Sequence, residues 1–485
     1  MRSERIEFGD FQTPAGLASE VCRVLRNRGV EPRSVLEPAC GRGSLLVAAL
    51  ETLPSIRSAV GLDIKAAHVE EARQTIEHLG HARKVRFMEG DFFQTDWAAL
   101  ARSLPDPVLV LGNPPWVTNA ALGRLGSSNL PPKNNARGFR GLDAVTGKSN
   151  FDISEWMLTR LLDVCHGRDA VVAMLCKTSV ARKVLAHAWA REISLDACEI
   201  HVIDARKHFR ATASACLLIC RLTRGGANRE CKVYSGLGGE QADHTLGLRD
   251  GLLVADVSAY DRWSTLQGSQ AFRWRSGVKH DCVKVMELSR DGLWYRNGYG
   301  IRARLEDDYL FPMVKGSDLF RGNTRTPERH MLVTQQRVGE DTGRIASSAP
   351  RTWRYLLSYG ADLDGRSSVV YRNKPRFSVF GVGEYTFSLW KVGIAGLYKE
   401  PIFRSLGPQH GKPVVLDDTC YFLPCRDSDH AHHLEKLLNS DVALEFFSAF
   451  IFRDAKRPVT ADMLGKLDLL KLAKELGEAP SKWLR

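Results

Sequence analysis

Residues 34–46 read Ser-Val-Leu-Glu-Pro-Ala-Cys-Gly-Arg-Gly-Ser-Leu-Leu. The apolar start predicts a buried strand, the glycines predict a tight turn, and the closing residues predict the first turn of a helix. Glycine at such a turn lets the backbone approach a ligand closely. The stretch therefore predicts a strand–turn–helix unit of an open α/β sheet, with a binding loop at the end of its strand.

Two further apolar runs end in acidic residues. Residues 60–64 read Val-Gly-Leu-Asp-Ile, and residues 85–93 read Val-Arg-Phe-Met-Glu-Gly-Asp-Phe-Phe. An acid about 20 residues after a glycine-containing turn can accept hydrogen bonds from ribose hydroxyls, and Asp63 has that spacing. Asp91 can accept from an adenine amino group, while Phe92 can cover the adenine ring. Three strand ends thus suit an adenosine-type cofactor.

The fourth strand end carries the motif Asn113-Pro114-Pro115-Trp116, which follows the apolar run Val108–Gly112. Asn113 offers a carboxamide oxygen as an acceptor. The two prolines fix the backbone, remove two N–H donors and leave their carbonyls as acceptors. Trp116 supplies a flat face for stacking. Alone, two prolines after a strand indicate a plain turn, but beside a cofactor site the motif predicts a clamp for a planar exocyclic amino group.

In their order along the chain, these motifs resemble those of the γ class of S-adenosylmethionine-dependent N6-adenine DNA methyltransferases. Residues 8–14 (Phe-Gly-Asp-Phe-Gln-Thr-Pro) look like the extra cofactor motif of that class and lie before the glycine loop, as they do in the γ class. The resemblance implies a Rossmann-like α/β domain with a mostly parallel seven-stranded sheet, followed by a mixed, β-rich target-recognition domain. It is specific through Trp116 and fainter through residues 151–156 and 208–215.

The resemblance also implies roles for single residues. Cofactor binding falls to Gln12, Thr13, Pro14, Glu37, Pro38, Ala39, Cys40, Gly41, Gly43, Asp63, Ile64, Asp91 and Phe92, and catalysis to Asn113, Pro114, Pro115 and Trp116. Trp116 also stacks on the target base. Phe209 is either a second wall of the base pocket or a core residue between two strands. The chain departs from the family at Cys176-Lys177-Thr178, where relatives often carry a proline after the strand.

The implied reaction moves the methyl group of S-adenosylmethionine to the N6 amino group of an adenine in duplex DNA. That amine is a poor nucleophile because its lone pair is delocalised into the ring. Asn113 and the carbonyl of Pro114 would draw it out of the ring plane, so that proximity and orientation do most of the catalytic work. The base must first flip out of the duplex, which costs a few kcal/mol, and stacking on Trp116 offsets part of that cost.

Composition agrees with this interpretation. The chain has 485 residues, enough for two domains, and a formal net charge of +12, which favours attraction to a DNA backbone. The eleven cysteines are scattered and show no zinc spacing, so we expect no metal and a reduced, cytoplasmic setting. We find no signal peptide and no apolar run long enough to span a bilayer.

The pattern along the chain predicts its organisation. Helices are expected at 17–29 and 151–165, and further strands at 170–175, 199–204 and 215–220. Residues 117–150 are rich in glycine and basic side chains; we expect a lid that meets DNA phosphates rather than a plain insertion. The DNA-binding residues expected there are Arg124, Lys133, Arg137 and Arg140.

We place the domain boundary after a turn-rich stretch at 223–231. Residues 1–234 are then the cofactor-binding catalytic domain, and residues 235–485 the DNA target-recognition domain. The second part lacks alternation of strands and helices. It mixes aromatic and basic residues at 294–297, 353–355 and 371–377, a combination that suits nucleic-acid contact but also an ordinary solvated β-surface.

Other functions use related loops. Cytosine N4 is an alternative acceptor, as are guanine amines of RNA and the glutamine amide of a protein. Asn113 favours adenine over cytosine, and the roughly 250 residues after the clamp argue against the RNA and protein enzymes. A DNA-binding relative without catalysis is disfavoured by the intact clamp and glycine loop. We expect a monomer that acts in a restriction–modification or phage-defence system, with a cognate restriction endonuclease or defence protein as partner.

Overall fold

The computed structural model describes residues 12–117, 152–268, 272–325 and 328–478. The chain divides into two compact units, Met1–Val257 and Ser258–Arg485. The first unit reaches past the predicted boundary at residue 234, because the strands that follow pair with the sheet of that unit.

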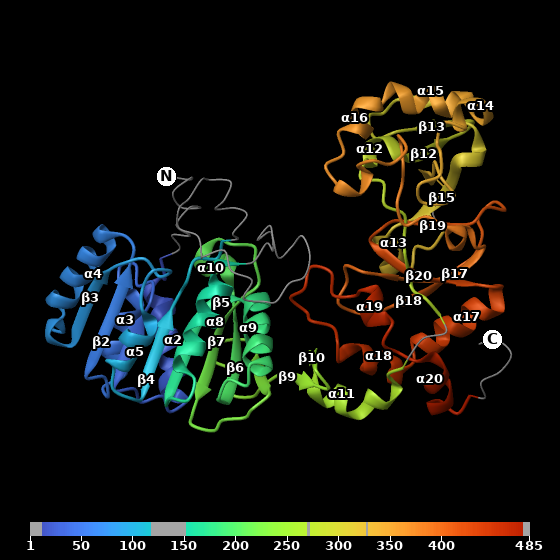
Figure 1. The fold of residues 1–485 in the computed structure, drawn as a ribbon. Helices are drawn as coiled ribbons and strands as arrows, with labels where there is room; N and C mark the ends of the chain where they lie inside the picture. Colours follow the sequence, from blue (N-terminus) through green and yellow to red (C-terminus); the bar gives the residue numbers. More distant parts are fainter. Residues whose placement is uncertain (1–11, 118–151, 269–271, 326–327, 479–485) are drawn as a thin grey trace. The chain divides into compact units, whose positions relative to one another are not determined.

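The first unit is built on one ten-stranded sheet, whose strands run from blue to green in Figure 1. The sheet order is β10-β9-β8-β6-β7-β5-β4-β1-β2-β3. The strands are β1 (Ser34–Glu37), β2 (Ser58–Asp63), β3 (Val85–Glu89), β4 (Val108–Gly112), β5 (Ala170–Lys177), β6 (Leu195–Ile203), β7 (Ala215–Leu222), β8 (Glu230–Tyr234), β9 (His244–Arg249) and β10 (Leu252–Val254).

The seven predicted strands are all present, and three more extend the sheet. β1 to β5 pair in parallel in the order β3-β2-β1-β4-β5, while β7 runs antiparallel to both β5 and β6. The predicted number of seven is therefore corrected to ten. β8 pairs in parallel with β6, and β9 and β10 follow as an antiparallel extension. The unpaired edge that β6 would present is a ready template for another strand, and β8 covers it.

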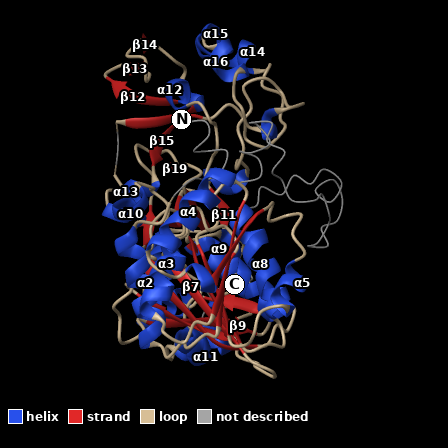
Figure 2. Ribbon diagram, turned by 90° about the vertical axis from the view of Figure 1, so that its left-hand side faces the viewer, coloured by secondary structure: helices blue, strands red, loops and turns tan. Residues whose placement is uncertain are grey.

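Helices cover both faces of this sheet. They are α2 (Ala15–Asn27), α3 (Ser44–Thr52), α4 (Ala66–His78), α5 (Trp97–Arg102), α8 (Ile153–Cys165), α9 (Thr178–Ala190) and α10 (Ala205–Phe209). Successive residues of a strand face opposite sides, so Val108 and Val110 of β4 join the core under α5 and α8, while Leu109 and Leu111 join the core under α2 and α3. Figure 2 shows these two helix layers on either side of the strands.

Four cysteines form two cross-strand pairs on β5, β7 and β6. Cys176 of β5 is in register with Cys216 of β7, and Cys198 of β6 is in register with Cys220 of the same β7. All four are buried free thiols. The hydrogen bond with Cys216, together with burial, raises the pKa of Cys176 well above its ordinary value. These side chains act as small core residues.

The second unit is rich in β-structure, as expected. One sheet has the order β11-β20-β17-β18, and another has the order β14-β13-β12-β16-β15-β19. The strands are β11 (Arg275–Ser276), β12 (Glu287–Asp291), β13 (Trp294–Arg296), β14 (Arg302–Ala303), β15 (Leu310–Val314), β16 (Arg329–Leu332), β17 (Trp390–Ala395), β18 (Phe403–Leu406), β19 (Val415–Leu416) and β20 (Cys420–Cys425).

Short helices surround these two sheets. They are α11 (Val257–Trp263), which starts at the unit boundary, α12 (Val283–Met286), α13 (Gly316–Arg321), α14 (Ile345–Ser348), α15 (Pro350–Ser358), α16 (Gly360–Asp364), α17 (Ser428–Leu438), α18 (Asp441–Ser448), α19 (Ala461–Leu464) and α20 (Leu469–Glu475). None of the helices in the described ranges has both the length and the apolar character needed to cross a bilayer.

One lysine is buried inside the four-stranded sheet. Lys391 of β17 is 1% exposed, and its Nζ donates a hydrogen bond to the backbone carbonyl of Ser388. Burial disfavours the charged form and lowers the pKa of Lys391 to about 7. An ionisable group that loses its charge on folding makes stability depend on pH.

We expect Lys391→Met to change that dependence. The pKa of about 7 in the fold lies below the ordinary 10.5, so the folded state binds fewer protons and the cost of burying the amine shrinks as pH rises from 7 towards 10.5. The free energy of unfolding of the variant, taken relative to wild type, should therefore fall by about 2 kcal/mol between pH 7 and pH 9. Urea titrations that follow the unfolding of the second unit at pH 7 and pH 9 measure this change in the free energy of unfolding.

The matched control is Lys399→Met, which removes an exposed lysine of the same unit. Its free energy of unfolding, relative to wild type, should not change between the two pH values. A difference between Lys391→Met and wild type that stays constant with pH would contradict a buried amine that titrates near neutrality.

Candidate active site

A cavity of about 870 Å³, counting the solvent at its mouth, opens at the carboxyl ends of β1, β2, β3 and β4. Parallel strands bring these ends to one edge of the sheet, where such folds keep their ligands. Of the predicted residues, the cavity is lined by Gln12, Thr13, Glu37, Pro38, Ala39, Cys40, Gly41, Asp63, Ile64, Asp91, Phe92, Asn113 and Pro115. Pro14, Gly43, Pro114 and Trp116 lie close by in sequence but are not among the lining residues.

The turn after β1 needs its glycines. Gly41 and Gly43 have φ angles of 49° and 79°, in the left-handed region that favours glycine. A Cβ on Gly41 would lie 2.5 Å from Gln12 Oε1, so the Gln12 side chain would have to move away from the turn. Gln12 Oε1 also accepts a hydrogen bond of 3.1 Å from the backbone N–H of Arg42. Gln12 and Thr13 therefore form one wall of the cavity together with the glycine turn.

Asp63, at the end of β2, holds the same turn from the other side. Its Oδ2 accepts from the backbone N–H of Gly41 at 2.9 Å, and its Oδ1 accepts from the backbone N–H of Lys65 at 2.9 Å. His68 of α4 places Nδ1 3.5 Å from Asp63 Oδ1. Each carboxylate oxygen has a second lone pair, so Asp63 can order the turn and still accept from a ligand.

Glu37 ends β1 inside the cavity wall with only 2% of its surface exposed. Among the described residues, its Oε2 atom has no hydrogen-bond partner. Burial, with the nearby negative charge of Asp63, raises the pKa of Glu37 well above its usual range. A buried oxygen that lacks a donor, in the wall of a cavity, is suited to a ligand that brings a donor.

The segment after β3 adds an acid and two aromatic rings. Asp91 Oδ1 accepts from the backbone N–H of Phe93 at 2.8 Å, which fixes the carboxylate at the cavity edge. The Phe92 ring packs on Trp97 with centroids 4.5 Å apart, and the Phe93 ring meets Trp156 edge to face at 5.1 Å. Both phenylalanines line the cavity, although only Phe92 was predicted to do so.

Several other lining residues were not predicted. They are Ser44, Leu45, Leu62, Lys65, His68, Gly90, Phe93, Ile153 and Met157. Most of these residues are sequence neighbours of a predicted residue. Their position at the end of a strand is the feature of the sequence that could have identified them. Ile153 and Met157 come from α8, whose start is brought back to the cavity by a hydrogen bond from the Ile153 N–H to the carbonyl of Val117 at 2.8 Å. No local sequence pattern predicts that the start of α8 lies at the cavity.

The clamp motif begins where β4 ends. Asn113 and Pro115 line the cavity, and Asn113 Nδ2 donates to Thr13 Oγ1 at 3.2 Å. Thr13 is 8% exposed, so the acceptor of this hydrogen bond is a buried side chain. Because the amide nitrogen is turned towards Thr13, the direction of the Asn113 carboxamide oxygen is set as well.

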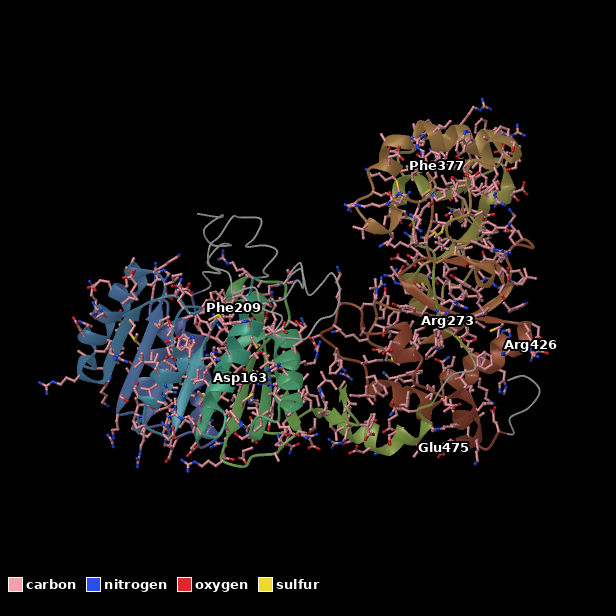
Figure 3. The ribbon with its side chains drawn as sticks, in the orientation of Figure 1. Asp163, Phe209, Arg273, Phe377, Arg426 and Glu475 are labelled. Atoms are coloured by element: carbon pink, nitrogen blue, oxygen red, sulfur yellow. The ribbon has the colours of Figure 1, made fainter. Side chains whose placement is uncertain are left out.

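The structure brings Trp116 and Phe209 together. Their ring centroids lie 5.0 Å apart at an interplanar angle of 68°, and each ring residue is 8% exposed. Phe209 ends α10 and is labelled in Figure 3. The two rings touch edge to face, so in this arrangement no base lies between them. Trp116 Nε1 donates to the carbonyl of Leu175 at 3.3 Å.

The predicted DNA-binding residues cannot be placed at the cavity. Arg124, Lys133, Arg137 and Arg140 lie outside the described residues, as does most of the stretch 117–150. Within the described ranges, no cluster of histidine, cysteine and acidic side chains has the arrangement of a metal site.

Comparisons with known proteins place this geometry in a family. Residues 31–107, which hold the glycine turn, Asp63 and Asp91, match the family described as "Methyltransferase domain". Among solved structures, the type IIL restriction-modification enzyme MmeI in complex with DNA aligns with 95% of this chain at a TM-score of 0.54 and 13% identity. This chain spans 64% of that enzyme's length, and at such identity the likeness shows the fold alone.

A curated relative reaches further. The Type II methyltransferase M.NspV of Nostoc sp. (strain ATCC 29411 / PCC 7524) is 41% identical over 471 residues, which cover 97% of this chain and 98% of the relative. The alignment thus spans nearly the full length of both chains. The methyltransferase assignment predicted from the motifs is thus confirmed, and this chain belongs to the type II methyltransferases.

Proposed function

We propose that this protein transfers the methyl group of S-adenosylmethionine to the N6 amino group of an adenine flipped out of duplex DNA. The observation that carries the proposal is the position of Asn113 and Pro115, which line the same cavity as Glu37, Asp63 and Asp91. An amine clamp and a set of acceptors for an adenosine-type cofactor thus share one space. That is the arrangement that methyl transfer to a nucleobase amine needs.

The cavity residues fit S-adenosylmethionine. Asp63 would accept from the ribose hydroxyls and Asp91 from the adenine amino group, while Phe92 and Phe93 would cover the adenine ring. Glu37 Oε2, buried and lacking a donor among the described residues, would accept from a polar hydrogen of the cofactor. When bound, S-adenosylmethionine supplies an electrophilic methyl group on a positively charged sulfur.

The clamp prepares the nucleophile. The lone pair of an adenine amine is delocalised into the ring, and acceptors placed outside the ring plane draw the nitrogen towards a tetrahedral shape. Asn113 Oδ1 and the carbonyl of Pro114 are these acceptors, and the bond from Asn113 Nδ2 to Thr13 keeps the oxygen aimed. The extra proton of the methylated nitrogen is strongly acidic and leaves to water afterwards. Orientation, rather than a general base, therefore supplies most of the rate.

Access of the base depends on Trp116. Stacking on its indole would offset part of the few kcal/mol needed to unpair and unstack a base. Since Trp116 is 8% exposed and meets the Phe209 ring edge to face, the indole face must be uncovered when a base arrives. Phe209 would then support the indole from its side.

Recognition of a DNA site is assigned to the residues from about 235 onward, most of which form the second unit. The net charge of +12 supports a polyanionic substrate, and the solved type IIL enzyme that shares the fold was determined in complex with DNA. Arg124, Lys133, Arg137 and Arg140 are proposed to contact phosphates. A cognate restriction endonuclease would cut the same sequence when it is unmethylated.

Nucleoside mass spectrometry of DNA from an expressing host tests the acceptor: N6-methyladenine supports the proposal, and N4-methylcytosine refutes its adenine part.

The first test of the site is Asn113→Ala. Losing the carboxamide oxygen removes one of the two acceptors on the amine, so we expect methyl transfer to fall by roughly 10²–10³-fold, as when one oriented polar group is lost from an active site. Tritiated-methyl incorporation into unmethylated plasmid DNA measures the rate. Calorimetry with S-adenosylhomocysteine should give nearly wild-type affinity. A variant that methylates at the wild-type rate would refute the clamp.

The second test uses the raised pKa of Glu37. S-adenosylmethionine carries a net positive charge, which favours the ionised carboxylate and lowers the pKa of Glu37 on binding. Binding should therefore release a proton in the pH range between the raised pKa of Glu37 in the free protein and its lower pKa in the complex. Calorimetry in two buffers with different ionisation enthalpies counts the protons. Glu37→Gln, which cannot ionise, is the control and should release none; equal proton release by both proteins would rule out Glu37 as the source.

A further inference from the structure

The clamp loop has little backbone support of its own. Sheet pairing between β4 and β5 ends with Gly112 opposite Met174. Pro114 and Pro115 have no N–H, so they cannot continue the ladder of hydrogen bonds along β5. Bonds that involve side chains therefore matter more here than they do within the sheet.

Lys177, the last residue of β5, forms such a bond. Its Nζ donates to the backbone carbonyl of Trp116 at 2.9 Å and to Asp152 Oδ2 at 2.5 Å. Trp116 in turn donates through Nε1 to the carbonyl of Leu175 at 3.3 Å. Two hydrogen bonds thus join Trp116, the last residue of the clamp motif, to the end of β5: one from the Lys177 side chain to the Trp116 carbonyl and one from the Trp116 indole to the Leu175 carbonyl.

Asp152 is itself held rigidly. It is 6% exposed, and its Oδ1 accepts from the backbone N–H of Ser154 at 3.1 Å, which caps the first turn of α8. The ammonium of Lys177 is consequently fixed between an anchored carboxylate and a carbonyl of the clamp. A hydrogen bond from a charged donor is about twice as strong as a neutral one, and a buried partner adds to its precision.

We propose that Lys177 is a positioning residue for methyl transfer. By holding the Trp116 carbonyl, it keeps the Pro114-Pro115-Trp116 backbone where the carbonyl of Pro114 meets the amine. Lys177 does not line the cofactor cavity, so its effect is on the clamp and not on cofactor affinity. The proposal rests on the proposed function.

The chain offers a matched control. Lys183 of α9 lies 3.2 Å from Glu155 of α8, and that glutamate is as buried as Asp152. Both ion pairs join the β5–α9 segment to the start of α8. The pair of Lys177 with Asp152 is also bonded to the clamp, through the carbonyl of Trp116. A merely structural role predicts similar effects for both lysines, whereas the positioning role predicts an effect for Lys177 alone.

The experiment compares wild type, Lys177→Met, Lys183→Met and the double variant Lys177→Met with Asp152→Asn. Enzyme in excess over unmethylated plasmid DNA gives the single-turnover rate of tritiated-methyl incorporation. Separate measurements give the KM for the same DNA and the Kd for S-adenosylhomocysteine. We expect Lys177→Met to slow the single-turnover rate by roughly 10- to 100-fold, the effect of a misplacement of about 1 Å, with KM and Kd nearly unchanged. Lys183→Met should keep the wild-type rate.

The double variant separates positioning from a side effect. Lys177→Met leaves the buried Asp152 carboxylate without its cation, which can disturb the fold by itself. Asp152→Asn removes that charge and keeps an oxygen to cap α8, so the double variant should fold and remain slow. Recovery of the wild-type rate in the double variant would overturn the proposal, as would a wild-type rate in Lys177→Met or equal losses in both lysine variants. Failure of the wild-type protein to methylate DNA would instead refute the proposed function.

Discussion

The hydrogen bond from the Gly41 N–H to Asp63 Oδ2 joins the ends of two neighbouring strands, and the cavity depends on it. It holds the glycine turn in its left-handed conformation, which in turn lets Gln12 close in from the segment before α2. The backbone N–H of Cys40 donates to the carbonyl of Leu62 in β2 at 2.8 Å, so two successive residues of the turn are held to the strand that carries Asp63. One carboxylate thus serves both the architecture of the pocket and, in the proposed function, the ligand.

Glu37 and Lys391 are both buried ionisable groups, but the shifts of their pKa values arise in different surroundings. Glu37 lies in the wall of a cavity with an oxygen that no described group satisfies, and in the proposed function a ligand would donate to that oxygen. Lys391 lies inside a sheet, and its amine is bonded to a backbone carbonyl, so its lowered pKa reflects the cost of packing. Burial shifts both values, and only the surroundings distinguish a site from a structural compromise.

Much of the first unit was predictable from local patterns. Apolar runs that end in Asp63, Asp91 and Asn113 predicted β2, β3 and β4, because strand ends of a parallel sheet carry the polar groups. What the sequence did not reveal is long-range. The pairing of β8 with β6, the bond from Lys177 to Trp116, and the return of Ile153 to Val117 each join segments with no shared local signal. Phe209 could be read as a wall or a core residue, and only the structure shows its ring against Trp116.

The cysteines paired in register across β5, β7 and β6 have a consequence for how this sheet can be observed. Thiols react as thiolates, and these four are buried, with the ionisation of Cys176 and Cys198 further suppressed by their hydrogen-bonded neighbours and by burial. An alkylating reagent can reach them only when the strands part. The rate at which these sulfurs are alkylated therefore measures how often the strands β5, β6 and β7 separate, without any added label.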